Sequence, residues 1–401
     1  MKAMEWAMNR MPKTEDRKLA LMCREEIKKA KLFHKSFPQY CKTPLCSLTK
    51  MAQYLGLEKL YIKDESYRFE LNAFKVLGGS YAIARYIAQK TGRSITELGY
   101  EKLLSEDVLN ELGSLTFYTA TDGNHGKGVA WAANKLGQKS VVLMPKGSTK
   151  TRLQSILDEN ADAWITEFNY DECVRMAAEA ASKDSHGVMV QDTAWEGYEE
   201  IPTWIMQGYG TMALEVVEEL EELAALPPTH VFVQAGVGSL AGAVAGMMHN
   251  LYPKNPPKII VVEAEAAACL YQSAKLGDGS IRIVGGDMPT IMAGLACGEP
   301  NTISWDILKN HVEAFIALPD WIDARAMRML AAPIKGDPPV CSGESGAAPF
   351  GALMSIMLME EYSELKELLK LDQNSRVLLF STEGDTDPQV YKSIVWEGKE
   401  R

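Results

Sequence analysis

A lysine in an apolar setting is the first candidate for chemistry in this sequence. Lys75 lies within NAFKVLGGS (72–80), next to apolar residues and just before a Gly-Gly pair. Because lysine strongly prefers exposure, this setting suggests one of two arrangements. Either the aliphatic stem is buried while the ammonium reaches solvent, or the amine has a lowered pKa and is suited to Schiff-base chemistry. Taken alone, the segment favours the first arrangement.

The loop TDGNHGKG (121–128) joins a predicted strand at 115–120 to a predicted helix that ends near Gly137. Small and polar residues at such a junction expose backbone N–H groups at a helix N-terminus, and these can bind a carboxylate or a phosphate. An ordinary strand-to-helix turn has the same composition, so the loop by itself leaves both interpretations open. Its polar side chains come from Thr121, Asp122, Asn124 and His125.

A glycine-rich turn, QAGVGSLAG (234–242), connects a predicted strand at 230–234 to a helix of small residues. Glycines here allow the backbone to approach a phosphate, and the helix dipole adds attraction. The turn also nearly fits a dinucleotide-binding pattern, with Glu263 at the end of the next strand as a ribose-binding acid. That alternative is disfavoured because the turn lies far from the chain start. A dinucleotide site would also leave Lys75 and the loop at 121–128 without a role. The candidates for phosphate binding are Gly236, Val237, Gly238, Ser239 and Leu240.

Two acids and a threonine complete the set of candidates. Asp192 belongs to VQDTAWEGYEEIPTWIMQGYGT (190–211), an aromatic-rich segment at a predicted domain junction, where small ligands usually bind. Glu344 begins a small-residue helix, where an acid also stabilises the helix dipole. Thr382 follows a buried strand in RVLLFSTEGDTDP (376–388). None of these residues identifies a reaction by itself.

Composition and charge restrict the class of protein. The chain has 401 residues, of which 46% are hydrophobic and 24% charged, as in soluble globular proteins. A net charge of −11 disfavours nucleic acid and anionic membrane surfaces as partners, and no apolar run reaches the ~18 residues that span a bilayer. The first residues lack an apolar signal core and the seven cysteines form no CxxC pair, so we expect a cytoplasmic protein. No set of cysteines and histidines completes a zinc site, so no metal is expected.

The alternation of strands and helices predicts an α/β protein with parallel sheets. We expect a large α/β domain formed by residues 1–90 and 195–401, and a small inserted α/β domain formed by residues 91–194. The ligand-binding cleft should lie between the two domains. In the inserted domain, strands are expected at 140–144, 162–166 and 188–191, and helices near 149–158 and 170–183.

Six motifs carry a resemblance to known proteins: NAFK, TDGNHGKGVAW, QDTAWEGY with IPTWIMQGY, GGDMPTIMAGLACGEPN, SGESGA and STEGDTD. Their order resembles that in the pyridoxal phosphate (PLP) enzymes of the tryptophan-synthase-β type, also called fold type II. Within that group, the chain looks like the diaminopropionate ammonia-lyases over about residues 40–398. Asn72, where most fold type II enzymes carry serine, and Val237, which interrupts a run of glycines, depart from the wider pattern.

The resemblance implies that PLP lies in the cleft between the two domains. Lys75 would hold the cofactor as an imine, the glycine turn would bind its phosphate, and Asn124 would contact its ring hydroxyl. Thr382 would face the pyridine nitrogen. A neutral hydroxyl cannot hold that nitrogen protonated as a carboxylate can, which favours expulsion of a β-substituent over transamination. The substrate-binding residues implied are Thr121, Asp122, His125, Asp192 and Glu344.

The reaction implied by the resemblance is the α,β-elimination of 2,3-diaminopropionate to pyruvate and two ammonia molecules, catalysed by a homodimer. An amine leaves poorly unless it is protonated, so a carboxylate is needed next to the β-nitrogen. In the resembling family, Asp122 and Asp192 are implicated as the bases for the D and L isomers respectively. Two alternatives stay open. One is a serine or threonine dehydratase or β-replacement enzyme of the same fold, which Asp122 disfavours; the other is a nucleotide-dependent enzyme or a non-catalytic small-molecule binder.

Overall fold

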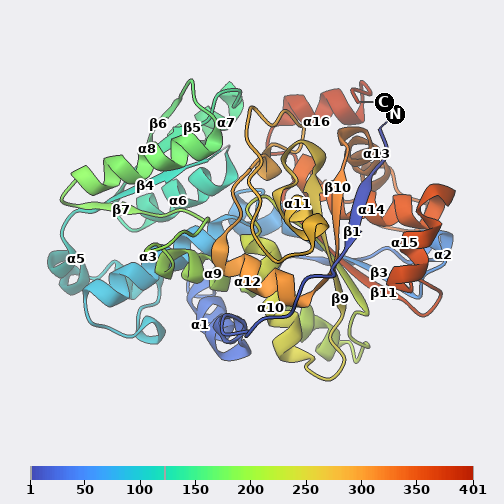
Figure 1. The fold of residues 1–401 in the computed structure, drawn as a ribbon. Helices are drawn as coiled ribbons and strands as arrows, with labels where there is room; N and C mark the ends of the chain where they lie inside the picture. The colour runs from blue at the N-terminus through green and yellow to red at the C-terminus, as the bar shows by residue number, and fades with distance from the viewer. Residues whose placement is uncertain (1, 122, 401) are drawn as a thin grey trace.

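The computed structural model describes residues 2–121 and 123–400, which form two β-sheets covered by helices (Figure 1). Within these ranges, the larger sheet has seven strands in the order β1-β10-β9-β8-β11-β3-β2, and the smaller has four in the order β6-β5-β4-β7. The larger sheet consists of β1 (Glu5–Met8), β2 (Leu45–Ser47), β3 (Lys59–Asp64), β8 (His230–Gln234), β9 (Lys258–Ala264), β10 (Val312–Leu318) and β11 (Arg376–Ser381). The smaller sheet consists of β4 (Thr116–Ala120), β5 (Lys139–Met144), β6 (Asp162–Ile165) and β7 (Gly187–Met189).

The interior strands of the larger sheet are parallel, and its two edge strands are antiparallel to their neighbours. The edge strand β1 pairs with β10, and the edge strand β2 pairs with β3. Helices cover both faces of the sheet: Val231 and Val233 of β8 share a core with α10 (Ser239–Leu251), whereas Phe232 shares a core with α14 (Glu344–Leu358). This burial on both faces explains the apolar sequence of the strands. The predicted parallel architecture is therefore correct for the sheet interior, and antiparallel edges are a common addition.

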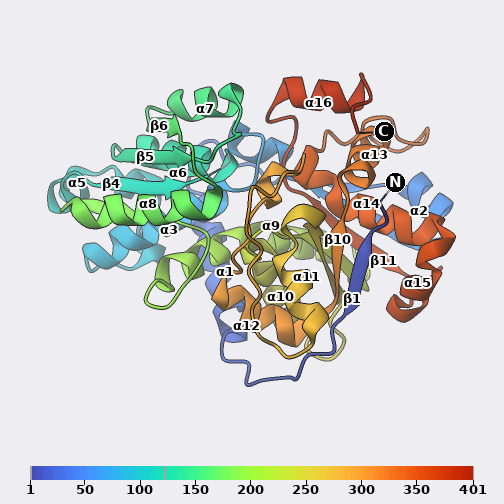
Figure 2. The ribbon, with the colours of Figure 1, turned by 45° about the horizontal axis from the view of Figure 1, so that its top comes forward.

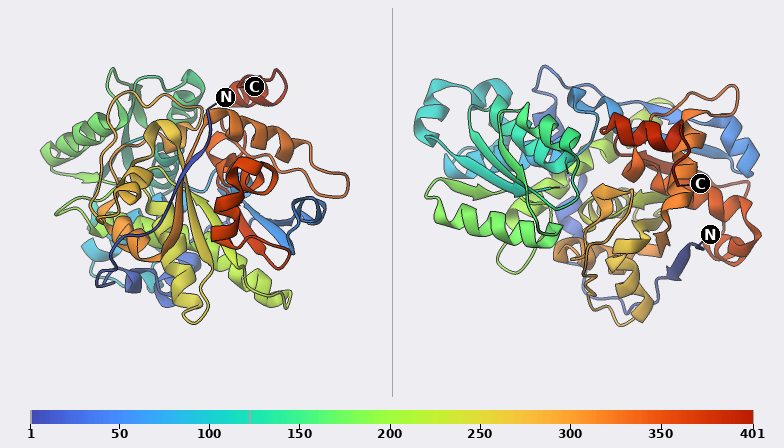
Figure 3. Two further views of the ribbon diagram at one scale, coloured as in Figure 1. Left: turned by 45° about the vertical axis from the view of Figure 1, so that its right-hand side comes forward. Right: turned by 90° about the horizontal axis from the view of Figure 1, so that it is seen from above.

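The smaller sheet is entirely parallel and forms a unit at one side of the molecule (Figures 2 and 3). Its strands alternate with α6 (Asn124–Lys135), α7 (Lys150–Leu157) and α8 (Tyr170–Lys183), in the predicted order. These elements all lie inside the range 91–194 that the sequence suggested for an inserted domain. The exact limits of the two domains remain a prediction.

Helix α3 (Val76–Lys90) lies between the two units. It packs against α9 (Glu200–Glu222) and against α6 of the smaller unit. Because Lys75 directly precedes α3, the helix places this lysine between the units. In the part of the chain that the structure describes, no helix is long and apolar enough to cross a membrane.

The remaining helices surround these elements. The α-helices are α1 (Arg24–His34), α2 (Thr49–Leu55), α4 (Tyr100–Leu103), α5 (Glu106–Leu112), α11 (Cys269–Leu276), α12 (Thr302–His311), α13 (Asp320–Ala331), α15 (Ser363–Leu369) and α16 (Pro388–Val395). The 3-10 helices are η1 (Leu19–Met22), η2 (Glu65–Glu70), η3 (Ile95–Glu97), η4 (Glu265–Ala267), η5 (Ala293–Leu295) and η6 (Glu360–Tyr362).

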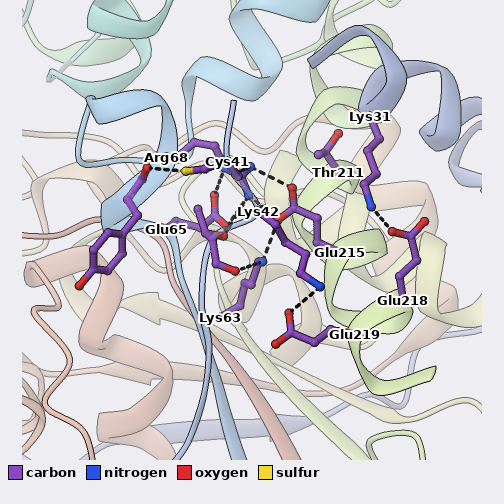
Figure 4. Close-up of polar contacts among 12 residues, drawn as sticks. Lys31, Cys41, Lys42, Lys63, Glu65, Arg68, Thr211, Glu215, Glu218 and Glu219 are labelled. Atoms are coloured by element: carbon purple, nitrogen blue, oxygen red, sulfur yellow. Dashed lines mark hydrogen bonds and ion pairs between the residues drawn. The ribbon is translucent and has the colours of Figure 1, made fainter. Parts of the chain in front are cut away.

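Four charged side chains form a fully buried cluster next to the segment that leads to Lys75 (Figure 4). Lys63 Nζ and Arg68 Nη2 each lie 2.7 Å from Glu215 Oε2, and Arg68 Nε lies 2.8 Å from Glu65 Oε2. Burial opposes the charged form of Glu215, but the two cations more than offset this and lower its pKa to about 2. The cluster therefore joins β3, η2 and α9 through ion pairs inside the core.

We expect Glu215→Gln to lower the free energy of unfolding by about 3–5 kcal/mol, because the two buried cations would lose a carboxylate partner. The measurement is the midpoint of unfolding in urea. It is compared between proteins whose free energy of unfolding has the same dependence on urea concentration. Lys42→Ala is the matched control: Lys42 is 38% exposed and pairs with Glu219 and Glu222 at the surface, where such pairs contribute about 0–1 kcal/mol. Equal losses in the two variants would contradict the expectation.

Candidate active site

One cavity lies where carboxyl ends of strands from both sheets meet the start of α3. In open α/β sheets, ligands bind at this end of the strands. Many of the residues singled out in the sequence line this cavity together, although they come from distant segments. They are Lys75, Asn124, Asp192, Gly236, Val237, Gly238, Ser239, Leu240 and Thr382.

Lys75 and Asp192 form an ion pair inside this cavity. Lys75 Nζ contacts Asp192 Oδ2, and the Asp192 side chain is only 2% exposed. Burial lowers the pKa of Lys75, but the charge of Asp192 outweighs burial and raises this pKa above its usual value. Burial likewise raises the pKa of Asp192, but the charge of Lys75 outweighs it, and the pKa lies below its usual range. A buried carboxylate thus holds a charged amine, and the pKa of Lys75 is raised and not lowered as the Schiff-base interpretation expected. The role of Lys75 in Schiff-base chemistry remains a prediction.

Two tyrosines hold the carboxylate of Asp192 from other elements. The Tyr209 hydroxyl in α9 donates to Asp192 Oδ2 at 3.3 Å, and the Tyr170 hydroxyl in α8 donates to Asp192 Oδ1 at 3.3 Å. The backbone oxygen of Asp192 accepts hydrogen bonds from Ser239 and Asn301, which fixes the backbone as well. Several donors around a buried carboxylate favour its ionised form. Neither tyrosine was predicted from the sequence to be a site residue.

The glycine turn begins α10 and brings its backbone to the cavity. Gly238 has φ +101°, a conformation that favours glycine, and it is the N-cap of this 13-residue helix. A Cβ atom at Gly236 would lie 3.2 Å from Cys297 Sγ and 3.3 Å from the Gly294 oxygen, so a side chain there would crowd the wall of the cavity. A glycine turn at the N-terminus of a helix suits a phosphate.

The structure argues against a dinucleotide at this turn. Glu263 is fully buried, and its carboxylate accepts hydrogen bonds from the backbone nitrogens of Leu270 at 2.8 Å and Tyr271 at 2.6 Å. Burial raises the pKa of Glu263 to about 8. This acid caps α11 and does not line the cavity, so it is not available to a ribose. Among the described residues, no group of three or more His, Cys, Asp or Glu side chains could hold a metal ion.

Two hydroxyl groups line the cavity at the ends of β11 and α14. Thr382 Oγ1 accepts a hydrogen bond of 2.7 Å from Gln234 Nε2. Ser345 Oγ is buried, and no residue that the structure describes makes a hydrogen bond to it. A buried hydroxyl without a partner calls for an explanation, and a ligand in the cavity supplies one. Ser345 lies in the SGESGA motif, of which only the neighbouring residue, Glu344, was predicted from the sequence to be a site residue.

Asn124 contacts Glu383 and thereby links the two units across the cavity. Asn124 Nδ2 donates to Glu383 Oε2, and the Ser345 backbone nitrogen donates to Glu383 Oε1 at 2.9 Å. These contacts orient the amide of Asn124. Glu383 also lines the cavity, although it was not predicted from the sequence to be a site residue.

Some predicted substrate-binding residues do not line this cavity. Thr121 Oγ1 accepts a hydrogen bond from the Gly123 backbone nitrogen at 2.9 Å, and His125 Nε2 lies 3.0 Å from the Val190 oxygen. Glu344 is buried, and its Oε2 lies 3.8 Å from Arg152 Nη2. Burial and the neighbouring charge of Glu383 raise the pKa of Glu344 to about 7. Asp122 lies outside the described residues. The substrate-binding roles of Thr121, Asp122, His125 and Glu344 remain predictions.

Comparison with known proteins identifies the family. The model of the pyridoxal-phosphate dependent enzyme family matches residues 37–382. Diaminopropionate ammonia-lyase of Salmonella typhimurium is 51% identical over 368 residues, which cover 92% of this chain and 91% of that protein. The chain belongs to the diaminopropionate ammonia-lyase family. The Escherichia coli K12 ammonia-lyase is 48% identical over 94% of this chain and 93% of that protein.

Solved structures of the diaminopropionate ammonia-lyase family share this fold. The Escherichia coli enzyme in complex with D-serine has a TM-score of 0.92 and 44% identity, and the match covers 99% of this chain and 98% of that chain. A second structure of that enzyme, in complex with an aminoacrylate-PLP azomethine reaction intermediate, has a TM-score of 0.89. These matches confirm the predicted fold type II architecture and the predicted cofactor. The chain is a pyridoxal-phosphate-dependent lyase.

Proposed function

We propose that the chain catalyses the α,β-elimination of 2,3-diaminopropionate, in its D and L forms, to pyruvate and two ammonia molecules. The observation that carries this proposal is the ion pair of Lys75 with the buried carboxylate of Asp192, inside a cavity lined by the family motifs. In this ion pair, an amine that can bond the cofactor directly contacts a carboxylate that can accept a proton from the substrate.

The cavity residues fit PLP. The amine of Lys75 would bond the cofactor's aldehyde, and the turn at Gly236 and Gly238 would bind its phosphate. The hydroxyl of Thr382 and that of Ser345, which has no hydrogen-bond partner among the described residues, would form hydrogen bonds with polar atoms of the ring. When bound, PLP supplies an electron sink for the electrons released at the substrate's α-carbon.

Carboxylates of the chain would then bind the substrate's β-ammonium and accept the proton from its α-carbon. The β-amine leaves as ammonia only when it carries an extra proton, so a carboxylate that anchors the β-ammonium favours elimination. Asp192, which is kept ionised in its buried setting, would serve as the base for the L isomer, and Asp122 as the base for the D isomer. The neutral Thr382 beside the ring favours loss of the β-substituent over transamination.

The purified protein with PLP should change its absorbance on addition of DL-diaminopropionate and release pyruvate. Serine and threonine are the competing substrates, because the Salmonella typhimurium L-threonine dehydratase is 31% identical over 163 residues, or 40% of this chain. A higher kcat/KM for serine or threonine than for either isomer of diaminopropionate would favour the dehydratase alternative.

Replacing Gly236 by valine should weaken PLP binding by about ten- to hundredfold, because its side chain would crowd Cys297 where the phosphate is expected. Gly285→Val is the matched control, since a Cβ atom at Gly285 would have no neighbour within 4 Å. The measurement is the PLP dissociation constant of each variant, from absorbance or fluorescence titration. Retention of PLP together with loss of NAD affinity in Gly236→Val would instead support a dinucleotide site.

We also propose a cytoplasmic homodimer. No disulfide joins the seven cysteines, all of which lie in the described part of the chain, and this suits a reducing compartment. A single chain has a mass of 44.3 kDa, so light scattering should give about twice that value for the dimer. A mass near that of one chain would contradict the dimer.

A further inference from the structure

Tyr209 lies beside the ion pair of Lys75 and Asp192 but has no assigned role. It is fully buried in α9, and its ring centroid lies 4.7 Å from that of Phe74, the residue before Lys75. Its hydroxyl donates to Asp192 Oδ2, the same oxygen that Lys75 contacts. Lys75 Nζ also lies 5.8 Å from the centroid of the Tyr209 ring. One oxygen of Asp192 therefore accepts from both the amine and the phenol.

Two glycines allow Tyr209 to reach this position. A Cβ atom at Gly78 in α3 would lie 2.5 Å from Tyr209 Cε1. A Cβ atom at Gly208 in α9 would lie 2.3 Å from the backbone oxygen of Leu77. Any larger residue at either position would push α3 and α9 apart, because neither contact leaves room for a side chain. Gly78, the first glycine of the pair after Lys75, and the Gly208-Tyr209 pair in α9 therefore form one close contact between the two helices.

We propose that Tyr209 is a positioning residue that keeps Asp192 ionised and directed at the Lys75 nitrogen after that nitrogen has bonded to the cofactor. The inference rests on the proposed function, because it assumes that Asp192 acts in the reaction. Covalent bonding reduces the number of protons on the Lys75 nitrogen and weakens its hold on Asp192 Oδ2. Tyr209 then remains as a donor to this oxygen, while Tyr170 holds Oδ1.

Tyr209 acts by holding its proton and does not transfer it. Burial, and then the neighbouring charge of Asp192, keep the pKa of Tyr209 well above its usual value even though Lys75 opposes this. The phenol thus stays neutral and remains a hydrogen-bond donor across the working pH range. The titratable groups that face Asp192 in the described part of the chain are Lys75, His125, Tyr170, Tyr198 and Tyr209.

The test is the pH dependence of Tyr209→Phe, which removes one oxygen and retains the ring. Loss of a donor raises the pKa of Asp192, and Asp192 must be ionised to accept a proton. The acid limb of the kcat/KM profile should therefore move to higher pH by about one unit. The same shift should appear, without substrate, in the pH titration of the absorbance of bound PLP.

Tyr81→Phe is the matched control, because Tyr81 is a fully buried phenol in α3 whose hydroxyl lies 3.4 Å from Arg85 Nη1 and away from Asp192. It should leave both pH curves unchanged. A 3-fluorotyrosine at position 209 has a more acidic hydroxyl and is a stronger donor, so it should move both curves to lower pH. This substitution keeps the shape of the residue and tests the inference even if Tyr209→Phe folds poorly.

Three outcomes separate the inference from the proposed function. Unchanged curves in Tyr209→Phe and in the fluorotyrosine protein would overturn the role of Tyr209. Equal shifts in Tyr209→Phe and Tyr81→Phe would also overturn it, because the effect would then be structural. If no form of the protein releases pyruvate from diaminopropionate, the proposed function fails, but a shifted absorbance titration would still support the contact between Tyr209 and Asp192.

Discussion

Lys75→Ala should lower kcat for diaminopropionate elimination by at least about 10⁴-fold. The variant would lose the amine that bonds PLP. It would also leave Asp192 buried without its ion-pair partner. The measurements are pyruvate release and the absorbance of PLP after reduction with borohydride, which attaches the cofactor to the protein only through an amine.

Lys127→Ala is the control for Lys75→Ala. Lys127 is partly buried in α6, where burial lowers its pKa, and its Nζ lies 3.5 Å from the Leu71 oxygen, outside the cavity. This variant should keep its activity and its reducible PLP. Near-normal elimination by Lys75→Ala would exclude this lysine as the cofactor residue.

Asp192→Asn should lower kcat/KM for the L isomer by about 10²–10⁴-fold, the usual effect of removing a general base. The amide is nearly isosteric, so the assay reports the loss of charge and not a change of shape. Burial of Lys75 would also no longer be offset by a neighbouring anion, and the pKa of Lys75 should fall. The pH titration of the variant's bound PLP gives an independent measurement of this change.

The paired variant Asp122→Asn should mainly affect the D isomer. The decisive quantity is the ratio of kcat/KM for the D and L isomers in each variant, relative to the unmodified protein. If either carboxylate also anchors the β-ammonium, both variants lose activity on both isomers, but the ratios still move in opposite directions. Ratios that stay constant in both variants would rule out the two-base scheme and leave Lys75 as the base for both isomers.

Local sequence was sufficient for the parallel units and for the main wall of the cavity. Apolar runs separated by helical segments predicted the strands of the smaller sheet as well as β8 and β9. In the larger sheet, burial on both faces makes such strands continuously apolar. The glycine turn and the residue after β11, Thr382, were predictable for a related reason: ligands bind where parallel strands end. Lys75 was detectable because a lysine among apolar residues is unusual.

Some strands depend on pairing and not on local pattern. β10, whose seven residues directly follow α12, was not predicted from the sequence, because a short apolar run after a helix resembles a continuation of that helix. β10 is a strand because it pairs with β9 on one side and with β1 on the other, where Glu5 lies opposite Ala317. The same holds for β1 and β2, which are short edge strands with partners far along the chain.

By itself, the sequence determined the alternation of elements and the family, and it indicated Lys75 and the glycine turn as candidates for cofactor binding. Only the tertiary structure decided which polar groups meet: Tyr209 with Asp192, and Asn124 with Glu383, beside a cavity that Ser345 also lines. It also placed Arg68 and Glu215, which are 147 residues apart, in one buried ion pair. Apolar burial follows from periodicity, which is local. A buried charge is tolerated only beside a partner, and that partner is set by the packing of the whole chain.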